Sequence, residues 1–556
     1  MPKITIDGKE LTVDEGKTII QAADEAGIAI PRYCYHPGLR IVGQCRICLV
    51  EIEKMPKLQV ACYTRVQDGM VVHVNSERAK RARQQVLEFL LINHPIDCPV
   101  CDQAGECWLQ EYYMQFGLYD PKMTEDKVKK HKAVVVGPHV VLDSERCILC
   151  TRCVRFCDEI SKTSELGVFN RGDHAELLPY PGKTLDNPYS VNVVDICPVG
   201  ALTERDFRFR VRVWYLQRTP SICPGCSTGC NIEVHATRDR FYKNEGRRVA
   251  RLKPRYNPEV NDYWICDYGR YGFLYVDDAS RIPYPQVKEN GTFREIGWES
   301  AVLSVSSRLK QAVENGETVA VLASPQMTNE DLYALRRFAA SALKIQENDI
   351  PVTVKPLETP YSDDFLIRED KHPNTTGARL LGFDADPGAT KQLLEKCRKG
   401  EVQVLLLFHH NLFTGFSADV VQDALAKVDT VIFIGSNRHN TADLAHIQLP
   451  ACTFAEKDGT FTNYAGRVQR IHKAVDPLEE SLAEWLILRK LSRAMGVSMP
   501  YIEAEDVFRD MARNVPAFQG MSYQSIGERG QVVQENGRYE EKTVEAADMQ
   551  KAAASN

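Results

Sequence analysis

The sequence predicts small mixed α+β domains in its first half and a parallel α/β domain in its second half. Three observations lead to this prediction. Residues 4–13 alternate apolar and polar side chains about a turn at Asp7-Gly8, as in a β-hairpin. Of the 18 cysteines, 16 lie between residues 34 and 266. Beyond about residue 280, apolar runs alternate with helical stretches, the pattern of buried parallel strands joined by crossover helices.

The overall composition argues against several classes of protein. A chain of 556 residues is expected to form three to four domains at roughly 150 residues each. Its hydrophobic content of 44% and charged content of 26% are those of an ordinary globular chain, and a net charge of −6 provides no basic field for nucleic acid. No apolar run is long enough to span a membrane, and the first ten residues lack the pattern of a secretory signal. We therefore expect neither an integral membrane protein nor a secreted or disordered one.

The first elements have clear local signals. A helix is expected over residues 17–26, stopped by Gly27. A hairpin, a helix and a cysteine-bearing loop in this order are typical of a ferredoxin-like β-grasp domain. Ser76 is expected to cap a second helix, which ends near His94 because Pro95 cannot continue it.

The later elements are predicted from alternation and from apolar runs. FRFRVRV (207–213) alternates strictly and predicts a strand with its arginines on one face. This face is either solvated, a docking surface or a screen for anionic clusters. Strands are expected over 318–324, 402–408 and 430–436, helices over 328–344 and 387–399, and a loose tail from about 524.

Clustered thiols in a chain expected to stay in a reducing compartment indicate metal binding, because disulfides would not persist there. In the first group, four thiolates with a close pair in the middle can hold a [2Fe–2S] cluster on a β-grasp loop. The spacing is wider than in plant-type ferredoxins, with ten residues where those have four. Zinc is the alternative, but the preceding β-grasp pattern favours iron. The expected ligands are Cys34, Cys45, Cys48 and Cys62.

The second group contains a histidine. A lone histidine at a helix end is usually structural, but His94 stands four residues before a C-x2-C-x5-C loop and becomes a candidate ligand of a [4Fe–4S] cluster. Neutral imidazole in place of a thiolate removes a negative charge, which on charge grounds alone raises the cluster potential. The expected ligands are His94, Cys98, Cys101 and Cys107.

The third group has the most specific spacing, C-x2-C-x2-C, which suits one face of a [4Fe–4S] cube. Its fourth ligand is either Cys157 or Cys197. The bacterial ferredoxin run ends in Cys-Pro, and here Pro198 follows Cys197, so we expect Cys157 to be a free thiol. The expected ligands are Cys147, Cys150, Cys153 and Cys197.

A fourth group has the pattern C-x2-C-x3-C followed by a distant cysteine, which fits a third [4Fe–4S] cube. A structural zinc site is a competing interpretation, because C-x2-C pairs are common in zinc sites. The expected ligands are Cys223, Cys226, Cys230 and Cys266.

No motif for substrate chemistry stands out in the sequence. It has no G-x-G-x-x-G after a strand and no Walker A loop, hence no signature for nicotinamide or nucleotide phosphates. No Ser/His/Asp or paired-carboxylate motif is evident either. We expect no catalytic residue on this chain, only cofactors that carry single electrons.

Three segments together resemble a known family. HPIDCPVCDQAGECWLQ (94–110), CILCTRCVRFC (147–157) and DICPVGALT (195–203) look like the large iron–sulfur subunit family of NADH:quinone oxidoreductase, respiratory complex I, whose bacterial members are called the G subunit. This resemblance covers residues 1 to about 280. The fourth cysteine group and LPACTFAEKDGTFTNYAGRVQR (449–470) are similar to the molybdopterin oxidoreductase family, a looser match that runs to about 500.

The resemblance implies an electron-transfer subunit that accepts electrons from a flavin subunit oxidising NADH and relays them toward quinone. It implies one [2Fe–2S] and three [4Fe–4S] clusters, the fourth group matching a cube that some bacterial members hold off the main line. The implied partners are the other peripheral-arm subunits of the translocase, at the cytoplasmic side of the inner membrane and attached to it only through them. No molybdopterin is expected, because the stretch after EKDGTFTN is short for the second lobe that this cofactor needs.

The main alternative is the iron–sulfur/molybdopterin subunit of a formate dehydrogenase or an NAD-linked hydrogenase. An iron-only hydrogenase would need four more cysteines downstream, and a zinc-stapled interaction protein would contain no iron. The predicted domains are a 2Fe–2S ferredoxin-like domain (1–78), a 4Fe–4S domain with one histidine and three cysteine ligands (79–118), a 4Fe–4S ferredoxin-like domain (138–215), a 4Fe–4S domain of molybdopterin-oxidoreductase type (216–275), a shortened α/β domain (276–523) and a flexible tail (524–556).

Overall fold

A computed structural model describes residues 1–120 and 123–533 of the chain. The chain forms two compact units, which are treated separately below. The first unit comprises residues 1–219 and 230–277. The second comprises residues 220–229 and the chain from 278 onward. The predicted order of β-grasp, iron–sulfur and α/β architecture is confirmed.

The first unit begins with the predicted hairpin and helix. Asp7 and Gly8 both have positive φ, 45° and 83°, as a tight hairpin turn requires. The hairpin joins a five-stranded sheet of order β2-β1-β5-β3-β4, and the apolar face of helix α1 packs on it. The elements are β1 (Lys3–Ile6), β2 (Lys9–Thr12), α1 (Ile19–Glu25), β3 (Leu49–Ile52), β4 (Gln59–Val60) and β5 (Val71–His73).

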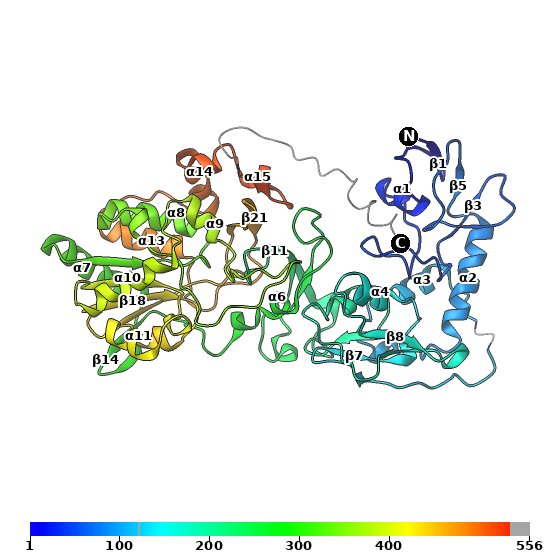
Figure 1. The fold of residues 1–556 in the computed structure, drawn as a ribbon, viewed down its shortest axis with the longest axis horizontal. Coiled ribbons are helices and arrows are strands. Elements are labelled where there is room, and N and C mark those ends of the chain that lie inside the picture. Colours follow the sequence, from blue (N-terminus) through cyan, green and yellow to red (C-terminus); the bar gives the residue numbers. More distant parts are fainter. Residues whose placement is uncertain (121–122, 534–556) are drawn as a thin grey trace. The chain divides into compact units, whose positions relative to one another are not determined.

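Two helices follow the sheet (Figure 1). Helix α2 (Glu77–Leu91) is capped as predicted, with the Ser76 hydroxyl accepting the backbone N–H of Ala79 at 3.2 Å. It ends before Pro95, and α3 (Trp108–Phe116) then packs against it. The two helices flank the loop that carries the second ligand group.

The rest of the first unit consists of small sheets and short helices. Its elements are β6 (Val134–Val135), β7 (Val140–Leu142), α4 (Arg152–Glu159), β8 (Leu166–Phe169), β9 (Glu176–Pro179), α5 (Asn192–Asp195), β10 (Leu202–Glu204), β12 (Asn231–Thr237), β13 (Val249–Pro254) and α6 (Asp267–Tyr271). Strand β11 (Leu216–Ile222), which belongs to the sheet β11-β12-β13, runs across the division between the units.

The prediction of a strand over residues 207–213 is wrong. These residues form turns followed by a short 3-10 helix that starts at Val213. Their arginines do not share a solvated face. Arg210 pairs with Asp206 and Glu245, and Arg212 donates to the backbone carbonyl of Cys101. The alternation of residue types predicted a strand. It failed here because alternation carries no information on the partners that each side chain binds.

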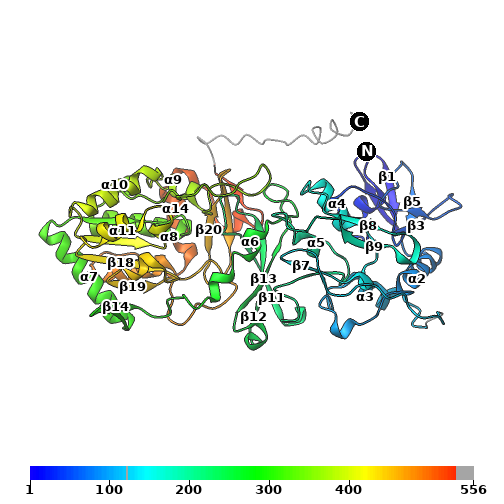
Figure 2. The same cartoon turned by 60° about the horizontal axis from the view of Figure 1, so that its bottom comes forward.

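The second unit is the predicted α/β domain (Figure 2). Its six-stranded sheet has the order β15-β14-β19-β18-β17-β16, and β16 to β19 are parallel. Helices α7, α8 and α13 cover one face, and α10 and α11 cover the other. The strands are β14 (Gln286–Glu289), β15 (Thr292–Glu295), β16 (Val319–Leu322), β17 (Val404–Phe408), β18 (Thr430–Gly435) and β19 (Ile447–Pro450). The helices are α7 (Trp298–Asn315), α8 (Asn329–Phe338), α9 (Thr375–Leu380), α10 (Pro387–Arg398), α11 (Ala418–Leu425), α12 (Asn440–Asp443) and α13 (Glu484–Ala494).

The chain remains regular beyond the point where a loose tail was predicted. Helix α14 (Ala504–Asn514) is followed by α15 (Tyr523–Ile526) and β22 (Gln531–Val532). Strand β22 pairs with β21 (Arg467–Ile471), which pairs in turn with β20 (Gly459–Thr462). Pairing with the edge of β21 therefore orders residues 531–532, which the polar composition assigned to a tail. Residues 534–556 of the predicted tail lie outside the described residues.

Candidate metal centres

The first ligand group lies on the loops around the β-grasp sheet. The backbone N–H of Cys34 approaches the Cys45 sulfur at 3.5 Å. The thiols of Cys45 and Cys62 hydrogen-bond that of Cys34 and lower its pKa, and Cys62 does the same for Cys48. The fold therefore brings together the four cysteines that the sequence grouped.

The third group lines one apolar cavity. The sulfur-bearing residues Cys147, Cys150, Cys153 and Cys197 all contribute to its wall. Burial raises the pKa of Cys147 and of Cys197 to about 12, so these thiols are protonated at neutral pH unless a metal displaces the proton.

Cys157 does not line this cavity. It lies in the last turn of α4, where its thiol meets the backbone of Glu165 and Leu166 at the start of β8. Burial raises the pKa of Cys157 to about 12. Cys153 and Cys157 lie one turn apart on α4, and of the two only Cys153 lines the cavity.

Three members of the second group help to line a pocket of about 940 Å³. His94, Cys98 and Cys107 are among the residues that line it. Burial lowers the pKa of His94 to about 4, so the imidazole is neutral at pH 7, as a metal ligand must be. Its buried Nδ1 has no hydrogen-bond partner within the described part of the chain. A ring nitrogen without a partner, in a pocket that Cys98 and Cys107 also line, fits a metal ligand.

Cys101, the remaining member of this group, packs against Gly200, which the sequence analysis did not single out. A Cβ on Gly200 would stand 2.2 Å from the Cys101 sulfur, so only glycine leaves room for it. Nearby, the backbone N–H of Trp108 donates to the Pro198 carbonyl at 2.9 Å. The loop after Cys197 therefore shapes the second group as well as the third.

Part of the backbone strain in the described residues lies in the ligand loops. Four non-glycine residues there have positive φ, namely Arg46 (61°), Ile96 (51°), Leu149 (53°) and Thr151 (61°). Left-handed residues turn successive N–H groups toward one side, a concavity that suits an anionic group. One of these groups, the N–H of Leu149, already points to the Cys147 sulfur at 3.4 Å.

Sulfurs of all three groups surround one small apolar cluster. Its core is Tyr33, Ile47, Leu87, Leu109, Val199 and Ala201. The residues packed against it include Cys45, Cys107, Cys147, Cys150 and Cys197. No three candidate ligands in the described residues are arranged for a single metal ion. The four ligands of a [4Fe–4S] cluster bind four different iron atoms, and those of a [2Fe–2S] cluster are divided between two, so neither ligand set need converge on one point.

The fourth group is divided between the two units. Cys223 and Cys226 belong to the second unit, where the Cys226 thiol faces the Leu366 carbonyl at 3.8 Å. Cys230 and Cys266 belong to the first unit, and the Cys266 sulfur caps helix α6 by accepting the N–H of Gly269. The assignment of these four thiols to one cluster therefore rests on their spacing.

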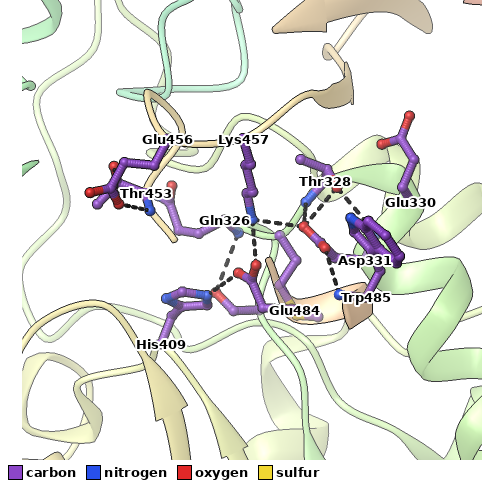
Figure 3. Close-up of polar contacts among 12 residues, drawn as sticks. Gln326, Thr328, Glu330, Asp331, His409, Thr453, Glu456, Lys457, Glu484 and Trp485 are labelled. Carbon is purple, nitrogen blue, oxygen red and sulfur yellow. Dashed lines mark hydrogen bonds and ion pairs between the residues drawn. The ribbon is translucent and has the colours of Figure 1, made fainter. Parts of the chain in front are cut away.

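In the second unit, the EKDG motif forms a buried network of charges (Figure 3). The Lys457 ammonium lies 2.7 Å from an Asp331 oxygen and 2.6 Å from a Glu484 oxygen, and all three side chains are almost fully buried. The other Glu484 oxygen binds His409 at 2.6 Å. Lys457 thus connects α8 with α13, and Glu484 extends the network to His409 in the loop after β17.

The neighbouring residues of the motif also have internal partners. The Glu456 carboxylate pairs with the buried guanidinium of Arg281 at 2.8 Å. A Cβ on Gly459 would stand 2.7 Å from the Thr328 side chain. In this chain, the side chains of the motif that resembles the molybdopterin oxidoreductase family therefore make contacts that stabilise the domain.

No helix in the described ranges combines the length and apolar character needed to cross a membrane.

Five family models match the chain in the order that the sequence predicts. They are described as a 2Fe–2S iron–sulfur cluster binding domain (2–77), the NADH-ubiquinone oxidoreductase-G iron–sulfur binding region (83–122), the ferredoxin-like domain of NADH-quinone oxidoreductase subunit 3 (137–203), the molybdopterin oxidoreductase Fe4S4 domain (216–278) and molybdopterin oxidoreductase (281–349 and 372–494).

Similar proteins carry related names. The G subunit of NADH-quinone oxidoreductase from Rickettsia felis is 39% identical over 336 residues, which are 60% of this chain and 48% of that protein. The mitochondrial 78 kDa NADH-ubiquinone oxidoreductase subunit of Neurospora crassa is 31% identical, over 93% of this chain and 83% of that protein. A solved NAD+-reducing [NiFe]-hydrogenase is 30% identical with a TM-score of 0.35, over 38% of this chain and 91% of that one.

The chain spans about half the length of the Rickettsia relatives that it matches, but most of the length of the mitochondrial one. The chain belongs to the family of large iron–sulfur subunits that includes the G subunit of NADH-quinone oxidoreductase and the mitochondrial 75 and 78 kDa NADH-ubiquinone oxidoreductase subunits.

Proposed function

We propose that this chain is the electron-transfer subunit of an NADH:quinone oxidoreductase of complex I type. One observation supports this most directly, namely that sulfurs from three separate ligand groups surround one apolar cluster within one unit. Such packing keeps the sites close together and away from water. Electrons can then pass between them without any substrate binding to this chain.

The ligand sets proposed are those of the sequence pattern. A [2Fe–2S] cluster takes Cys34, Cys45, Cys48 and Cys62, and three [4Fe–4S] clusters take His94, Cys98, Cys101 and Cys107, then Cys147, Cys150, Cys153 and Cys197, then Cys223, Cys226, Cys230 and Cys266. When bound, the clusters supply one-electron redox chemistry.

The protein supplies three things to these sites. Its thiolates and His94 hold the iron. The apolar cluster excludes water and lowers the local dielectric, which strengthens every charge interaction with a cluster. Backbone N–H groups such as that of Leu149 point at the sulfurs and stabilise negative charge there.

We assign no catalytic residue to the chain. NADH oxidation is proposed for a flavin-bearing partner and quinone reduction for other partners in the peripheral arm, at the cytoplasmic face of the membrane. The second unit is proposed to be scaffold without molybdopterin, because the EKDG residues Glu456 and Lys457 are engaged in internal ion pairs.

Iron analysis tests the proposal. The full chain, purified anaerobically, should contain about 14 iron atoms and give paramagnetic signals of one [2Fe–2S] and three [4Fe–4S] clusters on stepwise reduction. Stoichiometric zinc with little iron would overturn the proposal and favour a zinc-stapled interaction protein.

The match of residues 281–494 to molybdopterin oxidoreductases favours a second candidate, the iron–sulfur/molybdopterin subunit of a formate dehydrogenase or an NAD-linked hydrogenase. Molybdenum analysis of the intact complex from cells supplied with molybdate separates the two. We expect no molybdenum, whereas one molybdenum per chain would make this subunit an enzyme in its own right.

A further inference from the structure

Two arginines of helix α4 lie between the first and third ligand groups. The Arg155 side chain is almost fully buried, and its Nη2 donates to the backbone carbonyl of Cys34 at 2.5 Å and to that of Cys150 at 3.4 Å. Its Nη1 donates to the carbonyl of Arg40. One nitrogen atom thus connects a ligand residue of the first group with a ligand residue of the third.

Arg152 makes a parallel connection one turn earlier. Its Nη2 donates to the Tyr35 carbonyl at 2.5 Å, next to Cys34, and its Nη1 donates to the Ile196 carbonyl at 2.9 Å, next to Cys197. The guanidinium lies 4.5 Å from the centre of the Trp108 ring. Both arginines therefore fasten the first ligand loop to the residues that hold the third group.

Other contacts join the same two segments. The Gln44 amide donates to the Leu149 carbonyl at 2.5 Å. The exposed Arg40 side chain pairs with Glu159 at 3.1 Å. The charge of the Glu159 carboxylate is therefore compensated by Arg40. The two arginines are therefore central in a contact that spans more than 100 residues of sequence.

Neither buried guanidinium has a carboxylate partner among the described residues, and the Nε atom of each has no hydrogen bond there. A buried cation without a counter-charge destabilises the fold. The groups that interact electrostatically with Arg152 are Arg155 and the thiols of Cys34, Cys150 and Cys197. His36 also faces the pair, but burial and the two guanidiniums lower its pKa to about 3, so it is neutral.

We propose that Arg155, supported by Arg152, is a positioning residue that joins the first and third cluster sites and supplies the positive charge that both clusters require. The inference rests on the proposed function. A thiolate-ligated cluster gains one negative charge on reduction, so a nearby fixed cation stabilises its reduced form and raises its potential. The Arg155 hydrogen bonds also connect the backbones of Cys34 and Cys150, which fixes the spacing between the two sites.

The test compares three variants of the full chain by redox titration monitored with electron paramagnetic resonance. Arg155→Gln removes the charge, Arg155→Lys keeps it but cannot reach all three carbonyls, and Arg32→Gln is the control. Arg32 lies in the same loop, but its charge is compensated by Asp24 at 2.5 Å.

We expect Arg155→Gln to lower the potentials of the first and third clusters while the second keeps its own. Arg155→Lys should preserve both potentials but release iron faster from the first site, and the control should match the wild type.

A fully loaded Arg155→Gln chain with unchanged potentials would overturn the inference. If that variant loses the first and third clusters but keeps the second, the joining role is supported. The Lys variant then decides the role of the charge, because a lowered potential in it would refute that role. A wild-type chain without iron would instead overturn the proposed function.

Discussion

Replacing Lys457 with methionine tests whether the EKDG motif serves the fold. Methionine replaces the four-atom stem of the lysine side chain but removes the ammonium that lies 2.7 Å from Asp331 and 2.6 Å from Glu484. Asp331 retains its bonds from Thr328 and from the Trp485 N–H, and Glu484 retains His409. Breaking a buried ion pair on one side costs roughly 3–5 kcal/mol, and we expect a loss of that size.

The pH dependence of this loss has a definite sign. Burial alone would raise the pKa of Glu484, but the Lys457 ammonium and the His409 hydrogen bond outweigh it and lower the pKa to about 2. In the native chain this carboxylate therefore stabilises the fold above its ordinary pKa and loses that effect as pH falls toward 2. Without Lys457, burial raises its pKa, so the variant must lose more stability at about pH 8 than at about pH 5.

Calorimetry of the full chain measures this effect. The transition of the second unit should fall by about 6–20 °C in Lys457→Met. Lys473→Met is the matched control, since Lys473 pairs with Asp476 on the surface and its removal should cost no more than about 0.5 kcal/mol. A loss below about 1 kcal/mol, or an equal loss at both pH values, would refute the reasoning.

Four further substitutions, with one control, test the ligand sets. His94→Ala should remove the paramagnetic signal of the second cluster and leave the others, because every other set has four thiolates; an unchanged spectrum would make His94 a structural residue. Cys157→Ala should keep the third cluster and Cys197→Ala should lose it, as counted by iron per chain, and the reverse pattern would exchange their roles. Gly200→Ala should damage the second cluster, since its Cβ would meet the Cys101 sulfur at 2.2 Å, whereas alanine at Gly297, where no atom lies within 4 Å, should change nothing in the same spectra.

Local signals predicted the elements whose stability is local. The hairpin follows from its Asp7-Gly8 turn, and helix α2 follows from the Ser76 cap and the stop at Pro95. The parallel strands were predicted because buried strands are apolar throughout, as Val404–Phe408 shows. In these places the sequence pattern and the tertiary environment require the same residues.

Features that depend on distant partners were not predicted. The roles of Arg155 and Lys457 come from contacts with residues 121 and 126 positions away, and no spacing rule reveals them. Gly200 offered no signal either, because its constraint is the sulfur of Cys101 on another loop. Cysteine spacing, by contrast, predicted that the first group and Cys147, Cys150 and Cys153 lie together, since short loops restrict where their ligands can point. Cys197 was added to the third group because Pro198 follows it.

The division of the chain has a consequence for its dissection by proteolysis. The backbone passes between the units after Thr219, after Gly229 and after Asp277. The ten residues of this excursion are held in the second unit by bonds such as that from the Thr228 hydroxyl to the Leu366 carbonyl at 2.6 Å. A single cleavage near residue 277 would therefore leave residues 220–229 packed in the second unit while they remain covalently joined to the first fragment.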